Sequence, residues 1–101
     1  MNGFCQGDII KVSGFKNYFL VVSKNAFIKC MGVFHACPIL NTNEGPLHIP
    51  VVGKKGIEGV VVCEQVKILD PKARNCRTAD RIDYASIMNI SDALQGIFEY
   101  D

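Results

Sequence analysis

Four cationic side chains that follow a predicted strand form the first candidate binding surface in this chain. Two apolar runs, residues 60–63 and 66–69, precede them, and the second run ends at Asp70-Pro71, which is a strand-to-turn signal. These strands would place four cationic side chains at one edge of a small fold, namely Lys72, Arg74, Arg77 and Arg81. A cationic edge of this kind suits a phosphate-rich partner.

Proton transfer near neutral pH needs groups that titrate there, and the two histidines are the ordinary candidates. His48 lies in a short segment between two prolines and could act as a general acid or base. His35 lies in an apolar segment, where a packed histidine is the commoner arrangement. A purely structural role is the alternative for both residues.

The five cysteines form no pattern that predicts disulfides or a metal site. Their odd number and the absence of a C-x-x-C motif argue against a disulfide framework. Cys37 and Cys63 lie inside apolar runs and are expected in the core. The spacing of cysteines and histidines matches no common zinc template, so we expect neither a metal ion nor another cofactor.

The size and composition of the chain predict one globular domain. The 101 residues are 49 % hydrophobic, enough for a modest core within a single domain, residues 1–101. No apolar stretch approaches the roughly 20 residues of a membrane-spanning helix, so no membrane association is expected. The segment 1–7 lacks the basic and apolar regions of a signal peptide, and we therefore expect a cytoplasmic protein.

The net charge of +1 hides an asymmetry along the chain. Residues 1–81 hold all eleven basic side chains and six acidic ones, a net charge of +5, whereas residues 82–101 carry −4. A basic body with an acidic tail can present a phosphate-binding face away from that tail. The alternative is a set of unrelated charges on a solvated surface.

Alternating apolar and polar residues, bounded by glycine, proline and asparagine, predict a mostly β-stranded chain. The expected strands cover residues 8–13, 18–22, 31–37, 47–52, 60–63, 66–69 and, at an edge, 78–82. The first strand is expected to be half-buried and to form a hairpin with the second about a turn at residues 13–17. Ser23 and Asn25 can cap a short helical turn. Pro38 should lie at an edge or a bend, because proline cannot donate to a sheet ladder.

The last part of the chain changes to a helical period. Apolar side chains recur with helical spacing at Tyr84, Ile87, Met88, Leu94, Ile97 and Phe98. Asp83 is suited to cap this segment, so a helix is expected over about residues 83–97. Many short strands with tight turns and one terminal helix predict a small barrel closed by that helix.

Several segments resemble, in order and spacing, those of the MazF/PemK toxins, small bacterial proteins that pair with an antitoxin and mostly cut RNA. The most specific segment is residues 59–70, followed by Lys72-Ala73-Arg74. The others are Gly7-Asp8 with the two isoleucines after it, residues 20–27, 37–39 and 46–50. Together they span about residues 7–98.

The resemblance implies an SH3-like barrel of the MazF/PemK type with a C-terminal helix, assembled as a homodimer. It also implies a type II toxin that cuts single-stranded RNA without a metal ion and is bound by an acidic antitoxin peptide. In such a reaction a base takes the proton of the ribose 2′-hydroxyl, which attacks phosphorus. A cation stabilises the phosphoryl oxygens, and an acid protonates the leaving 5′-oxygen.

The chain departs from the family at both expected catalytic positions. The arginine expected before the second strand falls at Asn17, and the threonine expected after the third strand falls at Leu40. Lys16, beside Asn17, can replace the arginine as a point charge but lacks its planar fork. Lys16, Thr42 and His48 are therefore the candidate catalytic residues. The candidates for RNA or antitoxin binding are Asn17, Asn41, Glu64, Gln65, Lys72, Arg74 and Arg77.

Two functions stay open on these grounds. The first is a sequence-specific, metal-independent endoribonuclease that cleaves single-stranded RNA such as mRNA. The second is a non-catalytic module on the same fold that binds RNA or a protein partner, which the loss of the family's arginine and threonine favours. The pair Glu64-Gln65 matches an acid–amide pair of the family, with backbone bonding at the strand junction as its structural alternative. An unrelated small-barrel protein is a third possibility, against which residues 59–74 argue.

Overall fold

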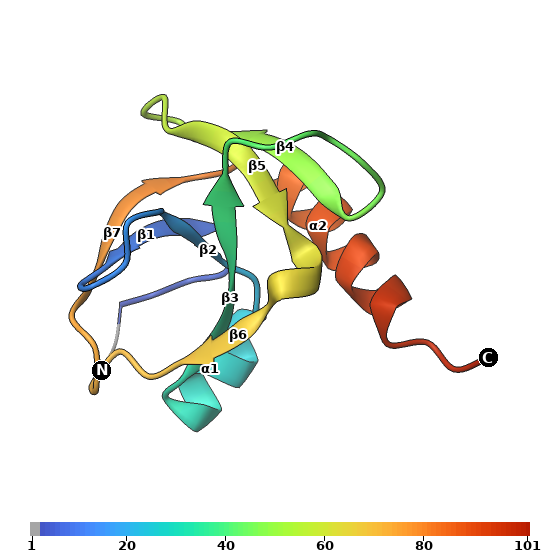
Figure 1. Cartoon of the computed structure of the whole chain (residues 1–101). Helices are drawn as coiled ribbons and strands as arrows, with labels where there is room; N and C mark the ends of the chain where they lie inside the picture. The colour runs from blue at the N-terminus through green and yellow to red at the C-terminus, as the bar shows by residue number, and fades with distance from the viewer. Residues whose placement is uncertain (1–2) are drawn as a thin grey trace.

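The chain folds into short antiparallel strands with a helix at the C-terminal end. The structure, a computed structural model, describes residues 3–101. In chain order its elements are β1 (Asp8–Val12), β2 (Phe19–Val21), α1 (Asn25–Met31), β3 (Phe34–Leu40), β4 (His48–Val52), β5 (Glu58–Val62), the 3-10 helix η1 (Cys63–Gln65), β6 (Lys67–Leu69), β7 (Cys76–Arg81) and α2 (Tyr84–Ile97) (Figure 1). The expected mainly β fold with a C-terminal helix is confirmed.

The strands form one sheet in the order β4-β5-β3-β2-β1-β7, and β6 pairs with β3 outside this path. β3 is the central strand, because β2 lies along one side of it while β6 and β5 pair with successive parts of the other side. Among residues 3–101 no ladder joins β4 to β7, so the sheet curves without closing. The sequence predicted a small barrel closed by the terminal helix, and the sheet itself is not closed.

Both faces of the central strands are buried, in two apolar clusters. The cluster under α2 contains Ile9, Leu20, Cys37, Val61, Cys63 and Ile90. The cluster beside α1 contains Ile10, Val12, Phe19, Ile28 and Phe34. The prediction of a half-buried β1 was wrong, because Ile9 and Ile10 point to opposite clusters and both are fully buried. The expected core positions of Cys37 and Cys63 are confirmed.

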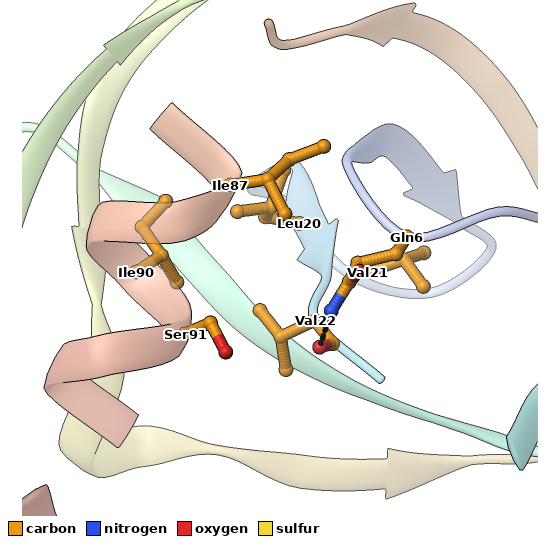
Figure 2. Close-up of a pocket in the computed structure, with 7 residues that line it drawn as sticks. All are labelled: Gln6, Leu20, Val21, Val22, Ile87, Ile90 and Ser91. Carbon is orange, nitrogen blue, oxygen red and sulfur yellow. Dashed lines mark hydrogen bonds between the residues drawn. The ribbon is translucent and has the colours of Figure 1, made fainter. Parts of the chain in front are cut away.

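α2 packs against η1 and β4, and Figure 2 shows where it also approaches β2. Ile87 and Ile90 of the helix lie opposite Leu20, and the side-chain amide of Gln6 closes one end by donating to the carbonyl oxygen of Val22 at 2.9 Å. The predicted N-cap is confirmed, since the Asp83 carboxylate accepts from the Ser86 N–H at 2.8 Å. Within the described chain, neither helix combines the length and the apolar character needed to cross a membrane.

The predicted apolar stripe of α2 was only partly right. Ile87, Leu94 and Ile97 pack against the core, together with Ile90, which the stripe omitted. Tyr84, Met88 and Phe98 are exposed. Tyr84 and Met88 lie on the outer face because the helix turns its isoleucine face inward, so this face remains partly apolar. Phe98 follows the helix and lines a hollow with His35 and Leu94.

β3 begins three residues later than predicted, because residues 25–31 form helix α1. Gly32 ends α1 with φ 73°, a left-handed conformation that favours glycine, and its N–H donates to the Ile28 carbonyl at 2.9 Å. Pro38 lies inside β3 rather than at an edge. The strand passes there from β6, which pairs up to Ala36, to β5, which pairs from Ile39, so proline costs no ladder bond.

The predicted caps of the first helix were also wrong. Lys24 is the N-cap of α1 and makes no side-chain cap bond. The Ser23 hydroxyl instead accepts from the His35 N–H at 2.6 Å and lies 3.0 Å from the ring Nδ1 of His35. Asn25 Oδ1 accepts from the Gln6 N–H at 2.7 Å. Both side chains tie distant segments to the start of α1, and His35 is a packed, hydrogen-bonded histidine in its strand.

Candidate functional site

An open hollow of about 660 Å³ lies between the β1–β2 turn, the end of β3 and the β4–β5 pair. Its polar lining brings together Lys16, Asn17, Asn41 and Glu58, and its apolar lining includes Tyr18, Leu40, Pro50 and Val60. The hollow therefore gathers side chains from four separate segments. Of the predicted site residues, it unites Lys16, Asn17 and Asn41.

The β1–β2 turn holds Lys16 at the rim of the hollow. The Lys11 ammonium donates to the carbonyl oxygens of Phe15 and Lys16, each at 2.8 Å, and so fixes the backbone on either side of the turn. Lys11 also lies 5.6 Å from the ring centroid of Tyr18. Because Lys11 is engaged in this way, the exposed Lys16 is the cation of the turn that remains available to a ligand.

Asn17 and Leu40 lie in the same hollow because β2 and β3 are paired there. The Ile39 N–H donates to the Tyr18 carbonyl at 2.8 Å, which places the residues before β2 beside the end of β3. Asn17 and Leu40 stand at the two positions where the family resemblance expects arginine and threonine. Thr42 is exposed in the loop after Asn41 and is not among the residues that line the hollow.

Glu58 is a functional candidate that sequence reasoning missed. It begins β5, is exposed and lines the hollow opposite the β1–β2 turn. Glu58 supplies a carboxylate to the lining of the hollow, and a carboxylate can accept a proton or repel an anion. Nothing in the sequence singles it out, because an exposed acidic residue at a strand end is commonplace.

Asp80 holds the β4–β5 turn, which connects the two strands that line the hollow, against β7. This carboxylate is 3 % exposed and accepts from the backbone N–H groups of Lys55 (2.8 Å), Ile57 (3.1 Å) and Arg81 (2.8 Å). Burial alone would raise the pKa of Asp80, but these backbone donors outweigh it and the pKa lies below its ordinary value. The Asp80 side chain bridges the open side of the sheet together with the backbone bond from the Lys54 N–H to the Arg81 carbonyl oxygen at 2.9 Å.

A cationic and aromatic surface lies on the other side of the β1–β2 turn. The Arg74 guanidinium lies 4.9 Å from the ring centroid of Phe15, and the Lys67 ammonium lies 5.2 Å from the same centroid. Arg77 is paired in register with Lys11, and both line a second hollow of about 340 Å³. We call Phe15, Lys67, Arg74 and Arg77 the hairpin surface. Lys67 was not predicted, because it lies in a strand separate from the other cations.

The prediction that four cations form one edge was wrong. Arg74 and Arg77 lie by the β1–β2 turn, but Lys72 lines a separate hollow next to α1, with Asn25 and Lys29. Arg81 is bound to Asp8, with its Nη2 and Nε at 2.8 and 2.9 Å from Asp8 Oδ1. Asp8 is fully buried, so Arg81 neutralises a core carboxylate. Lys72 and Arg74 lie in the loop before β7. Within β7 a register shift leaves Ala79 unpaired, so Arg77 and Arg81 do not share one side although they are four residues apart.

His48 and Glu64 form an ion pair away from the hollow. His48 Nε2 lies 2.8 Å from Glu64 Oε2, and His48 Nδ1 lies 3.1 Å from the carbonyl oxygen of Asn43. The hydrogen bond to Glu64 raises the pKa of His48, and the same bond lowers the pKa of Glu64. Glu64 therefore bonds a histidine rather than the backbone of a neighbouring strand. Gln65 is exposed in η1, and His48 is not among the residues that line the hollow.

Comparison with known proteins agrees with this geometry. Residues 7–98 match the family described as the PemK-like, MazF-like toxin of type II toxin-antitoxin systems. The chain belongs to this family. No curated protein matches the chain in sequence.

Solved structures of MazF/PemK toxins share the fold. The toxin in a MazE–MazF crystal structure from Deinococcus radiodurans superposes with a TM-score of 0.81 at 20 % identity, over 96 % of this chain and 97 % of that one. An endoribonuclease from a mycobacterial species superposes with a TM-score of 0.78 at 19 % identity, over 95 % of this chain and 91 % of that one. A mycobacterial endoribonuclease in complex with its cognate antitoxin superposes with a TM-score of 0.72 at 16 % identity, over 99 % of this chain and 100 % of that one. The resemblance of the MazF/PemK segments is thereby confirmed.

Proposed function

We propose that this MazF/PemK-family protein is the toxin of a type II toxin–antitoxin pair and cleaves single-stranded RNA in the hollow beside Lys16. The observation that carries the proposal is the meeting of Lys16, Asn17 and Asn41 in one open hollow. Single-stranded RNA suits an open hollow because its unpaired bases are accessible. An RNA substrate places the protein in the cytoplasm.

The residues of the hollow can supply the parts of a 2′-hydroxyl attack on phosphorus. The Glu58 carboxylate accepts the proton of the ribose 2′-hydroxyl, and the oxygen formed attacks the adjacent phosphorus. The Lys16 ammonium lies at the rim and stabilises the negative charge that develops on the phosphoryl oxygens. Asn17 and Asn41 donate amide hydrogen bonds to the substrate. Water enters the open hollow and protonates the leaving 5′-oxygen.

The hairpin surface continues the binding site for the RNA backbone. Arg74 and Lys67 stack on Phe15, so their charges are held close to Lys16 at the turn. In Figure 1 the β1–β2 turn and the C-terminal end of the acidic segment lie on opposite sides of the molecule. A strand of RNA bound across the turn therefore lies away from the C-terminal end of the chain.

A second candidate function, RNA or protein binding without cleavage, is favoured by a different observation. Asn17 and Leu40 occupy the hollow at the positions where arginine and threonine are expected. Neither carries positive charge or a hydroxyl. A hollow with Lys16 alone would still attract phosphate while lacking the planar fork of arginine.

Incubation of the purified protein with a long single-stranded RNA in the presence of EDTA distinguishes these functions. Under the first proposal the RNA is cut, and the products end in a 2′,3′-cyclic phosphate because the 2′-oxygen is the nucleophile. Retardation of intact RNA on a gel would support the binding module instead. RNA that is neither cut nor bound, even at a large excess of protein, would contradict both.

We propose a homodimer and an acidic antitoxin peptide as the protein assemblies. The outer face of α2 exposes Tyr84 and Met88, so apolar surface is available for a second copy. An acidic peptide would be attracted to Lys16 and the hairpin surface and would compete there with RNA. Such binding weakens as salt is added, since exposed charges are screened.

A further inference from the structure

The His48 ring contacts an oxygen acceptor at each of its two nitrogens. Nε2 faces the Glu64 carboxylate at 2.8 Å, and Nδ1 faces the Asn43 carbonyl at 3.1 Å. A neutral imidazole has one N–H, so it can donate to only one of these oxygens. The imidazolium ion has two N–H groups and can donate to both. The geometry therefore matches the protonated form of His48.

We propose that His48 is a positioning residue that, in its protonated form, ties the loop after β3 to η1 and so holds Asn41 and Thr42 beside the hollow. Deprotonation leaves one of the two oxygens without a donor, so the connection from the loop through the ring to η1 is broken and the loop is held less firmly. The site would therefore be regulated by pH through a residue that does not itself touch the substrate. This inference rests on the proposed function only in taking the hollow as the RNA site.

The loop has few other attachments, which makes this one effective. Residues 41–46 are all exposed. The loop is closed at its base by backbone bonds between Gly45 and His48, at 3.0 and 3.1 Å. Among the described residues, His48 is the one whose side chain bonds to residues 41–44, through the carbonyl oxygen of Asn43. Loss of this bond loosens the segment that carries Asn41.

The groups around the ring set the direction of the pH dependence. From η1 the ring is faced by Glu64, and Cys63 is the other titratable residue of that element. The loop before His48 carries Glu44, and β5, which pairs with β4, carries Glu58. α2 packs against η1 and β4, and its ionisable residues are Tyr84 and Asp92. No lysine or arginine occurs in any of these segments. The hydrogen bond to Glu64 raises the pKa of His48, so the tether is complete below the ordinary histidine pKa and is lost as pH rises through the raised value.

The tether also has an acid limit. Since the bond to His48 lowers the pKa of Glu64, the carboxylate stays ionised to a lower pH than usual. The contribution of Glu64 is present above its ordinary pKa and is lost as pH falls through the lowered value. The loop is therefore held over a window that runs from the acid side of the glutamate titration to the raised pKa of the histidine.

NMR of the full chain without RNA tests this inference independently of any catalysis. We expect the His48 ring to titrate above its ordinary pKa, and the Asn41–Asn43 amides to be ordered at pH 6 and mobile at pH 8.5. In Glu64→Gln the His48 pKa should fall towards its ordinary value. In His48→Gln both amide N–H groups are on one nitrogen, whereas the imidazolium carries its two N–H groups on separate ring nitrogens, so the loop should be mobile at both pH values. A His48 pKa at or below its ordinary value, or a loop equally ordered in all samples, would overturn the inference.

RNA binding provides the second readout. In the wild-type protein the affinity for single-stranded RNA should fall by about two- to five-fold between pH 6 and pH 8.5, the range expected for an exposed ion pair. His48→Gln should show the weaker affinity at both pH values. If NMR shows the tether but RNA does not bind at all, the proposed function fails and the positioning of the loop stands. Equal pH dependence in the variant and the wild type would contradict the role of His48.

Discussion

Replacement of Lys16 by alanine is expected to lower the rate of RNA cleavage by about 100-fold or more, the usual loss when a group that stabilises a developing oxyanion is removed. Lys16 is the cation that lines the hollow, whereas Lys11 is occupied by the backbone of the β1–β2 turn. Its removal leaves Glu58 as the charged side chain of the lining, so the hollow would repel phosphate. The measurement is a single-turnover cleavage rate at saturating protein.

Two further variants make this experiment specific. Lys16→Arg should retain the rate or raise it, because a guanidinium binds phosphate through two parallel N–H groups. Lys29→Ala removes an exposed lysine on α1, away from the hollow, and should leave the rate unchanged. A rate in Lys16→Ala equal to that of Lys29→Ala would exclude Lys16 from the reaction.

Arg74→Ala should behave differently from Lys16→Ala. Arg74 stacks on Phe15 outside the hollow, so it can attract the RNA backbone without contacting the reacting phosphate. Its loss should raise KM, leave kcat nearly unchanged and reduce the dependence of log affinity on log salt by about one. A fall in kcat alone would place Arg74 in the reaction rather than on the binding path.

Gly53→Ala is expected to destabilise the fold strongly. A Cβ at this position would lie 2.0 Å from Asp80 Oδ2, and Asp80 is buried with its oxygens bound to backbone donors. The new methyl must displace either the carboxylate or the β4–β5 turn. We expect a loss of about 1–3 kcal/mol in the free energy of unfolding, the usual penalty of overpacking a buried site.

Urea denaturation measures this loss as a lower midpoint with an unchanged slope. Gly45→Ala is the matched control, because a Cβ there meets no atom within 4 Å, and it should change stability by less than about 0.5 kcal/mol. Equal midpoints for the two variants would show that Asp80 does not hold the turn. Because the β4–β5 pair lines the hollow, Gly53→Ala should also weaken RNA binding in protein that is still folded.

The parts of the fold that the sequence predicts correctly are those set by local pattern. The β1–β2 hairpin follows from alternation and a glycine turn, and α2 follows from a helical period and the cap at Asp83. The start of β3 was misplaced because residues 31–33 suit both a strand and the end of a helix. Gly32 was the signal that decides between them, since it ends α1 in a left-handed conformation.

The candidate site was predictable only in part. Lys16, Asn17 and Asn41 were identified through the family resemblance, and the pairing of β2 with β3 brings them together. Three features depend on pairings between distant segments, which a single sequence does not reveal. These are the approach of His48 to Glu64 across 16 residues, the place of Glu58 in the hollow and the use of Arg81 to neutralise Asp8.

The central claim is that single-stranded RNA lies in the hollow beside Lys16 and crosses the β1–β2 turn. Amide chemical shifts recorded while a 2′-O-methylated RNA is added test it most directly, because this RNA binds but cannot be cut by 2′-hydroxyl attack. The account predicts that the largest shift changes fall on residues 16–18, 39–41 and 58–60, with smaller changes on the hairpin surface. Changes confined to α2, or no change at saturating RNA, would contradict it.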